Sequence, residues 1–154
     1  MKIAILGNAG SIHIVRWANG LVERGLLVHV ISAHPSTGGL DRRVILHQLQ
    51  NKAPIGYIGA VFELRGLLKA IRPDLLNAHY ATGYGLLARL ARFKPFLLSV
   101  WGSDVYLFPN KSIFHRALLR ANLRAASAIA STSLCMSTAV RKHLKEGVVF
   151  ITPF

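Results

Sequence analysis

Short apolar segments alternate with amphipathic segments along this chain, which is the pattern of strands separated by helices. The apolar segments are rich in Ile, Val and Leu and are bounded by Gly, Pro or Asn, so each of them predicts a strand. The predicted strands are residues 2–6, 27–32, 44–49, 74–78, 96–100, 128–131 and 148–151, with 44–49 the weakest and 148–151 expected to be buried.

The amphipathic segments repeat apolar residues at helical spacing. Ser11 can cap the first predicted helix, and Gly25 ends it. A last predicted helix covers residues 136–144. The predicted apolar faces of the four helices before it are Ile14, Ala18, Leu21 and Val22; Val61, Leu64, Leu68 and Ile71; Leu86, Leu87 and Leu90; and Phe114, Ala117, Leu118, Ala121 and Ala125.

This alternation predicts an α/β fold, a Rossmann-like, doubly wound parallel sheet covered by helices on both faces. In the strand order 3-2-1-4-5-6, the first strand lies beside the fourth, and the fifth follows. Ligands of such sheets bind beyond the carboxyl ends of the strands, where the strand order reverses. A functional site is therefore expected in the loops after the first, fourth and fifth strands.

The composition is that of one folded domain. A chain of 154 residues can bury a hydrophobic core, and 52% apolar against 16% charged residues argues against disorder. Every apolar run is interrupted well before the roughly 20 residues of a membrane span, and the N-terminal run is too short for a signal peptide. Cys135 is the single cysteine, so no internal disulfide can form and a reducing compartment is expected.

The net positive charge of the chain predicts a negatively charged partner. There are 19 Lys and Arg residues against 6 acidic residues, a formal charge of +13, which attracts nucleic acid, anionic lipid or phosphorylated ligands. The spread of the arginines over several elements argues against nucleic acid, and the loss of an acidic partner domain explains the charge as well as a lipid surface does. Arg116, Arg120 and Arg124 predict a cationic stripe opposite the apolar face of their helix, either a solvated surface or a contact with anionic lipid.

The loop after the first strand, "GNAGSIH", contains Gly7, Gly10, Ser11 and His13. Glycines let a backbone approach a ligand closely, and the helix N-terminus favours an anion. The spacing is not G-x-G-x-x-G, and no acidic residue follows the second strand to bind a ribose, so the sequence argues against NAD. A merely structural strand–helix turn is the alternative.

The loop after the fourth strand, "NAHYATGYG", contains His79, Tyr80 and Thr82. Hydrogen-bonding groups and an aromatic ring at a strand end suit a hydroxyl-rich ligand. In the alternative interpretation, His79 caps a helix or bonds to backbone.

The loop after the fifth strand, "SVWGSDVYLFP", contains Trp101, Gly102 and Asp104. Because three loops converge at this edge, we favour a ligand site there. Alternatively, Asp104 caps backbone amides and Trp101 packs on the end of the sheet. The histidines and Cys135 show no metal-ligand spacing, and no Gly-x-Ser-x-Gly elbow indicates a hydrolase.

Four stretches together resemble the N-terminal domain of a family 4 glycosyltransferase with the GT-B fold: "MKIAILGNAGSIHIVRWANGLVERG", "PDLLNAHYATGYG", "FLLSVWGSDVY" and "AIASTS". The resemblance covers essentially the whole chain. It implies that residues 1–154 are the acceptor-side half of an enzyme with two Rossmann-like domains, whose donor-binding C-terminal domain is absent from this chain. In the family, a strand similar to "VVFITPF" leads into a Gly-Val-Asp turn of the second domain, so we expect Phe154 to mark a domain edge.

The resemblance also implies roles for individual residues. Gly10 and Ser11 match the glycine-rich loop that approaches the donor phosphates in relatives. His79 and Tyr80 match a His-aromatic pair near the acceptor. Arg16, one helical turn past Ser11, is a further candidate for an anion contact.

Gly102 and Asp104 match a His-Gly-x-Asp turn of the family. Trp101 stands where many relatives have His, which removes the basis for a catalytic role at this position. Its large apolar ring suggests stacking on a sugar face instead.

The implied activity is that of a retaining glycosyltransferase in the synthesis of cell-surface polysaccharide, lipopolysaccharide or glycolipid. It would use a nucleotide-diphosphate sugar, a saccharide or lipid-linked acceptor and no metal. The implied partners are these substrates, the protein's own C-terminal domain and an anionic membrane surface, and no nucleic acid is expected. The implied location is the cytoplasm. If the protein binds lipid, we expect it to be peripheral on the inner face of the membrane. The chain alone is expected to be inactive, and the alternatives are a stand-alone Rossmann-type ligand-binding module and one subunit of a split glycosyltransferase.

Overall fold

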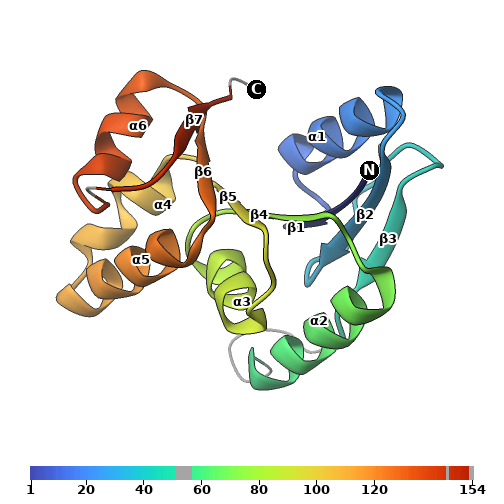
Figure 1. Cartoon of the computed structure of the whole chain (residues 1–154), viewed down its shortest axis with the longest axis horizontal. Helices are drawn as coiled ribbons and strands as arrows, with labels where there is room; N and C mark the ends of the chain where they lie inside the picture. The colour runs from blue at the N-terminus through green and yellow to red at the C-terminus, as the bar shows by residue number, and fades with distance from the viewer. Residues whose placement is uncertain (51–56, 145, 153–154) are drawn as a thin grey trace.

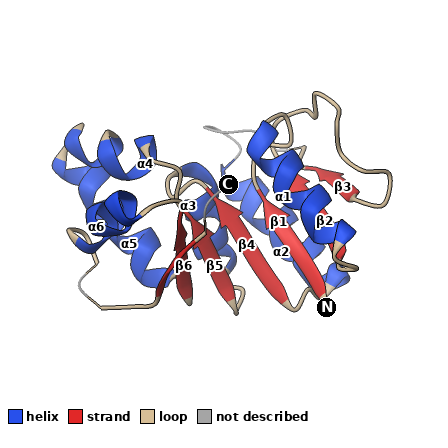
Figure 2. Cartoon of the chain, turned by 90° about the horizontal axis from the view of Figure 1, so that it is seen from above, coloured by secondary structure: helices blue, strands red, loops and turns tan. Residues whose placement is uncertain are grey.

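The computed structural model describes residues 1–50, 57–144 and 146–152. In this part of the chain, parallel strands form one sheet in the order β3-β2-β1-β4-β5-β6-β7 (Figures 1 and 2). The strands are β1 Lys2–Leu6, β2 Leu27–Ser32, β3 Ile45–Gln48, β4 Leu75–His79, β5 Phe96–Ser99, β6 Ala128–Ser131 and β7 Val149–Ile151. The predicted strand order is confirmed, with β7 added beyond β6.

Helices cover both faces of the sheet, as the alternating pattern predicts. They are α1 Ile12–Glu23, α2 Tyr57–Ile71, α3 Gly83–Ala91, α4 Ser103–Tyr106, α5 Ile113–Ala125 and α6 Leu134–Arg141, with the 3₁₀ helix η1 at Phe108–Asn110. The short α4 and η1 were not predicted, because four and three residues are too few to show a helical period. No helix in the described ranges is long and apolar enough to cross a membrane.

Alternate residues of β1 face opposite layers of the core. Ile3 and Ile5 pack with the buried residues of α1 in one hydrophobic cluster, whereas Ala4 and Leu6 belong to a second cluster with residues of α2 and α3. Figure 1 shows α1 on one side of the sheet and α2 and α3 on the other. Burial of both faces explains why the strands are almost continuously apolar.

Serine residues begin several of the helices. The Ser11 Oγ accepts a hydrogen bond from the His13 amide at 3.3 Å, which confirms the predicted cap of α1. Ser112 and Ser133 cap α5 and α6 in the same way. Each cap satisfies one of the amides that a helix N-terminus leaves unpaired.

The prediction of a buried last strand is wrong. β7 pairs with β6 on one side, and Phe150 and Ile151 keep 54% and 44% of their surface exposed. A β-branched apolar run predicts a strand equally well at the edge and at the centre of a sheet, so the pattern alone cannot assign burial.

The predicted apolar face of α5 is partly wrong, because Leu118, Ala121 and Ala125 are only half-buried. Phe114 is 81% exposed and Ala117 is exposed, whereas the buried residues are Leu119, Asn122 and Leu123. The Nδ2 of Asn122 donates to the carbonyl of Ala81 at 2.8 Å, and this hydrogen bond lets a polar side chain enter the core. In α3, the predicted apolar residue Leu90 is 39% exposed as well, and Tyr84 and Ala88 are buried beside Leu87.

Candidate functional site

The strand order reverses between β1 and β4, and the two residues that end these strands nearly touch. Gly7 follows β1 directly, and a Cβ atom on Gly7 would lie 3.4 Å from the Cβ of His79 and 2.6 Å from the Cδ1 of Ile14. A side chain at Gly7 would therefore force the Ile14 side chain to move, so glycine favours the close approach of β1, α1 and the end of β4. This is the place where doubly wound sheets bind their ligands.

The amides of the first loop are already bonded within the loop. The Gly10 amide donates to the Asn8 Oδ1 at 2.9 Å, and the Ser11 amide donates to the Asn8 carbonyl at 2.9 Å. A Cβ atom on Gly10 would come within 3.1 Å of the Pro35 carbonyl oxygen, so Gly10 also packs against the loop after β2. A phosphate group could bind the Gly10 amide only after the Asn8 side chain moves away.

The α1 helix contributes three residues with different placements. The ring of His13 lies edge-on to Trp101 with a centroid separation of 5.0 Å, and Trp17 lies 6.1 Å from the ring of His79. Arg16 is exposed and forms no ion pair among the described residues. His13 therefore joins the predicted site, whereas Arg16 remains a solvent-facing cation on the same helix.

His79 is a deeply buried titratable side chain of this edge, with 1% of its surface exposed. The indole Nε1–H of Trp101 donates to the His79 Nδ1 at 3.2 Å. An indole nitrogen can only donate, so Nδ1 is the acceptor and the neutral ring carries its hydrogen on Nε2. Within the described residues, this Nε2 has no hydrogen-bond partner.

Burial, with a smaller contribution from the nearby His13, lowers the pKa of His79 to about 3. The ring is consequently neutral at physiological pH. It can offer a single N–H to a ligand, and it is not a cation that would pair with a phosphate.

Tyr80 has an unusual backbone conformation next to His79. Its φ angle is +79°, in the left-handed region that a bulky side chain rarely adopts. The Tyr80 hydroxyl is 2.8 Å from the Ser103 Oγ, and its ring lies 6.2 Å from the ring of Trp101. Strain of this kind concentrates at functional sites, which supports a role for this loop.

Thr82 precedes α3, and its side chain makes no capping hydrogen bond. Its carbonyl accepts hydrogen bonds from the Leu86 amide at 2.8 Å and the Asn122 Nδ2 at 3.3 Å. Asn122, which sequence reasoning missed, therefore helps to fix the loop that follows β4.

Asp104 is fully buried and binds backbone amides, as the alternative interpretation of this residue proposed. Its carboxylate accepts hydrogen bonds from the amides of Ala81 at 2.7 Å, Gly102 at 2.8 Å and Trp101 at 3.1 Å. Burial raises the pKa of Asp104, while these three amides act in the opposite direction. The carboxylate thus links the loop after β4 to the loop after β5. Gly102, with a φ of +121°, allows the turn that brings Asp104 to this position.

A narrow crevice without room for a water molecule lies beside Trp101. Its other lining residues come from α1 and from the ends of β5, β6 and β7, and they are Trp17, Ser99, Val100, Ala130, Thr132 and Thr152. Trp17 and Thr132 were not predicted as site residues. The signal for Trp17 is its position four residues after His13, which places both rings on one side of α1.

In the part of the chain that the structure describes, no group of three or more His, Cys, Asp or Glu side chains is placed to hold a metal ion. The edge instead offers aromatic rings, one neutral imidazole N–H and several hydroxyl groups. Such a surface can bind the apolar face and the hydroxyls of a sugar.

Residues 2–133 match the family described as glycosyl transferase 4-like. This chain belongs to that family. A search of curated proteins found no match.

Solved structures share the fold of this family member at low sequence identity. Sucrose-phosphate synthase from Thermosynechococcus elongatus superposes with a TM-score of 0.80 at 14% identity, over 99% of this chain and 48% of that one. A putative UDP-N-acetylglucosamine 2-epimerase from Listeria monocytogenes gives 0.69 at 13% identity, over 99% and 44%. UDP-GlcNAc 2-epimerase from Neisseria meningitidis, bound to UDP-GlcNAc, gives 0.62 at 12%, over 99% and 46%. The chain therefore spans about half the length of these proteins and has the fold of half a GT-B enzyme.

Proposed function

We propose that this chain is the acceptor-side half of a retaining glycosyltransferase that uses a nucleotide-diphosphate sugar. The observation that carries the proposal is the arrangement of His79 and Trp101 at the point where the strand order reverses. A buried N–H without a partner costs about 1–3 kcal/mol, and a ligand oxygen that accepts from His79 Nε2 would recover this energy. The membership of the chain in a glycosyltransferase family supports a sugar as that ligand.

Each residue at this edge has a distinct role in the proposed reaction. Trp101 stacks on a sugar ring, His79 donates to a sugar oxygen, and Asp104 holds the backbone of both loops in place. The Tyr80 hydroxyl and Ser103 lie at the rim and can hold an acceptor hydroxyl against the reacting carbon.

The nucleoside diphosphate is the leaving group, and its developing charge must be stabilised. The N-terminus of α1 favours an anion, and the loop at Gly10 is the part of this chain that we assign to the donor phosphates. A second half of the enzyme supplies the remaining donor site, with no metal required. The lengths of the related structures, about twice that of this chain, support this division and predict that the chain alone is inactive.

The acceptor is a saccharide or lipid-linked saccharide in cell-surface polysaccharide, lipopolysaccharide or glycolipid synthesis. The formal charge of +13 supports a position in the cytoplasm at the anionic inner face of a membrane. Under this proposal the second half is either the continuation of the same polypeptide or a separate chain.

The test is nucleoside diphosphate release by the complete natural protein, measured with a panel of UDP, GDP and ADP sugars and a lipid and saccharide extract. We expect release from at least one donor that depends on the extract. The anomeric proton coupling of the product then reports whether configuration is retained. A folded protein that releases nothing from any donor contradicts the transferase proposal, and an inverted product contradicts only the retaining mechanism.

A further inference from the structure

A second candidate site lies at the opposite end of the sheet from β3, between α5 and α6. Arg116, Arg120 and Arg124 of α5 and Lys142 and His143 after α6 line two adjoining hollows, which we call the basic groove. The hollows measure about 520 and 720 Å³ and share Arg120, Lys142 and His143. None of the candidate residues at the carboxyl edge lines either of them.

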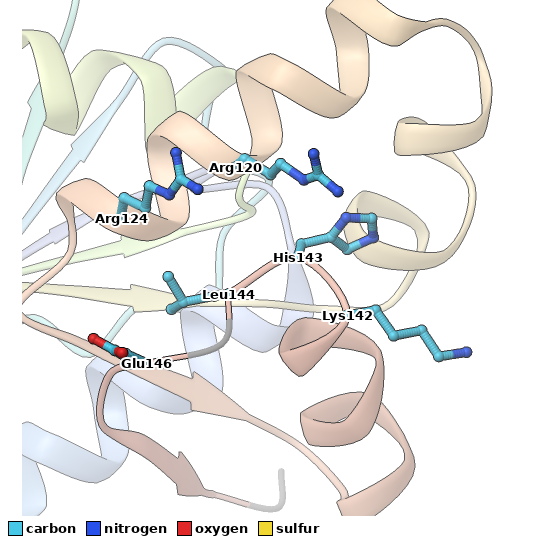
Figure 3. A pocket seen from close by; sticks show the side chains of 6 residues that line it. All are labelled: Arg120, Arg124, Lys142, His143, Leu144 and Glu146. Carbon is cyan, nitrogen blue, oxygen red and sulfur yellow. The ribbon is translucent and has the colours of Figure 1, made fainter.

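The groove joins basic residues of α5 with two that follow α6, which the sequence did not connect. The four-residue spacing on α5 predicted a stripe, but Lys142 and His143 come from a segment about twenty residues further along the chain. Figure 3 shows Arg120 and Arg124 projecting from α5 on the side of the segment that bears His143 and Leu144. The stripe, whose three arginines are exposed, thus forms one wall of a shallow concave surface.

The basic residues of the groove, Arg116, Arg120, Arg124 and Lys142, form no salt bridges within the described part of the chain. Glu146 is the one acidic residue among the described residues that line the groove. The Nδ1 atom of His143 is buried and has no hydrogen-bond partner among the described residues. Burial, and then the charges of Arg120, Arg116 and Lys142, lower the pKa of His143, so these cations are close enough to repel additional positive charge.

We propose that the basic groove binds a phosphate group. Two guanidinium groups can each bind phosphate oxygens in bidentate fashion, and the lysine adds a point charge. The larger of the two hollows is also lined by Tyr106 and Leu134, and Leu134 is 73% exposed. The group attached to the phosphate can therefore be apolar. The bound molecule is therefore either a phospholipid headgroup or a free phosphate compound, and both supply the same recognised group.

The test uses the full chain, with inorganic pyrophosphate in one arm and vesicles in the other. Resonances of Arg120, Arg124 and His143 are followed by NMR during the pyrophosphate titration. Cosedimentation compares phosphatidylcholine vesicles with vesicles that contain phosphatidylglycerol. The variant R120Q/R124Q removes two charges from the groove, and R42Q/K69Q removes two from the other end of the sheet as the matched control.

We expect the groove variant to weaken binding at least tenfold in one or both arms, while the control stays within about twofold. A loss confined to vesicles identifies a lipid headgroup, and a loss confined to pyrophosphate identifies a soluble phosphate ligand. Absence of binding in both arms, or equal losses in the two variants, overturns the proposal. This inference does not rest on the proposed transferase function, because neither arm requires sugar transfer.

Discussion

The indole of Trp101 holds the imidazole of His79 in a single tautomer. The two side chains come from the ends of neighbouring strands, and the Nε1–H of Trp101 donates to the Nδ1 of His79 at 3.2 Å. The hydrogen of the ring is thereby directed away from Trp101, on a nitrogen that no described residue satisfies. The predictions below begin from this pair.

Substitution of Trp101 by Phe keeps an aromatic ring and removes the N–H donor. We expect His79 to lose its fixed tautomer and the protein to lose about 1–3 kcal/mol of unfolding free energy, because Nδ1 becomes an unpaired buried acceptor. Long-range ¹H–¹⁵N correlation spectra distinguish the two tautomers directly. An unchanged Nε2–H tautomer in Trp101→Phe shows that Trp101 does not set it.

The pH dependence of stability provides a test of the neutral state of His79. Its pKa is about 3 in the folded protein and 6.5 for an ordinary histidine, so the unfolded chain gains a proton first as the pH falls. The contribution of His79 to the free energy of unfolding is therefore constant above pH 6.5 and decreases between pH 6.5 and 3. The decrease is about 3 kcal/mol at pH 4.5 and about 5 kcal/mol at the end of the range.

Urea unfolding at pH 7 and 4.5 measures this decrease. The variant His79→Gln cannot titrate, so its loss of stability between the two pH values should be about 3 kcal/mol smaller than that of the natural protein. His115→Gln, which removes a half-buried imidazole of α5 away from this edge, serves as the control. Equal pH dependence of the natural protein and His79→Gln refutes the assignment.

Asp104 should be essential for the two loops of the site. In Asp104→Asn, one side-chain oxygen is replaced by an amino group that faces a backbone N–H, so at least one of three hydrogen bonds is lost. We expect destabilisation of about 2–4 kcal/mol, the range of a broken buried network. Thermal unfolding measures it, and a variant as stable as the natural protein shows that the carboxylate is dispensable.

Gly7 should not tolerate a side chain. Gly7→Ala places a methyl group 2.6 Å from the Cδ1 of Ile14, which predicts a loss of about 1–3 kcal/mol by overpacking. Gly66→Ala is the matched control, because a Cβ on Gly66 in α2 meets no atom within 4 Å and should stabilise the helix by up to about 1 kcal/mol. Equal effects of the two substitutions would exclude a close packing role for Gly7.

The sequence predicts the main features of this molecule because they follow from local periodicity and parallel pairing. The order of the strands brings His79 and Trp101 to one edge, and the convergence of these loops could be predicted without a structure. The buried face of α5 could not, because Asn122 enters the core through hydrogen bonds to a loop forty residues earlier in the chain.

Three further features depend on tertiary contacts that no local pattern reveals. The three-amide environment of Asp104 depends on the relative position of two loops, so the sequence could offer only alternatives for this residue. The proximity of Trp17 to His79 depends on how α1 packs across the sheet. The basic groove, similarly, depends on the position of α5 relative to the residues that follow α6.

The central claim is that the carboxyl edge at His79 and Trp101 binds a sugar ligand. The most direct measurement follows the Trp101 indole and His79 ring signals by ¹H–¹⁵N NMR while nucleotide sugars and simple glycosides are added. We predict that a bound ligand shifts both signals and leaves those of His29 and His47, on β2 and β3, unchanged. A ligand that binds without shifting either Trp101 or His79 would contradict the account.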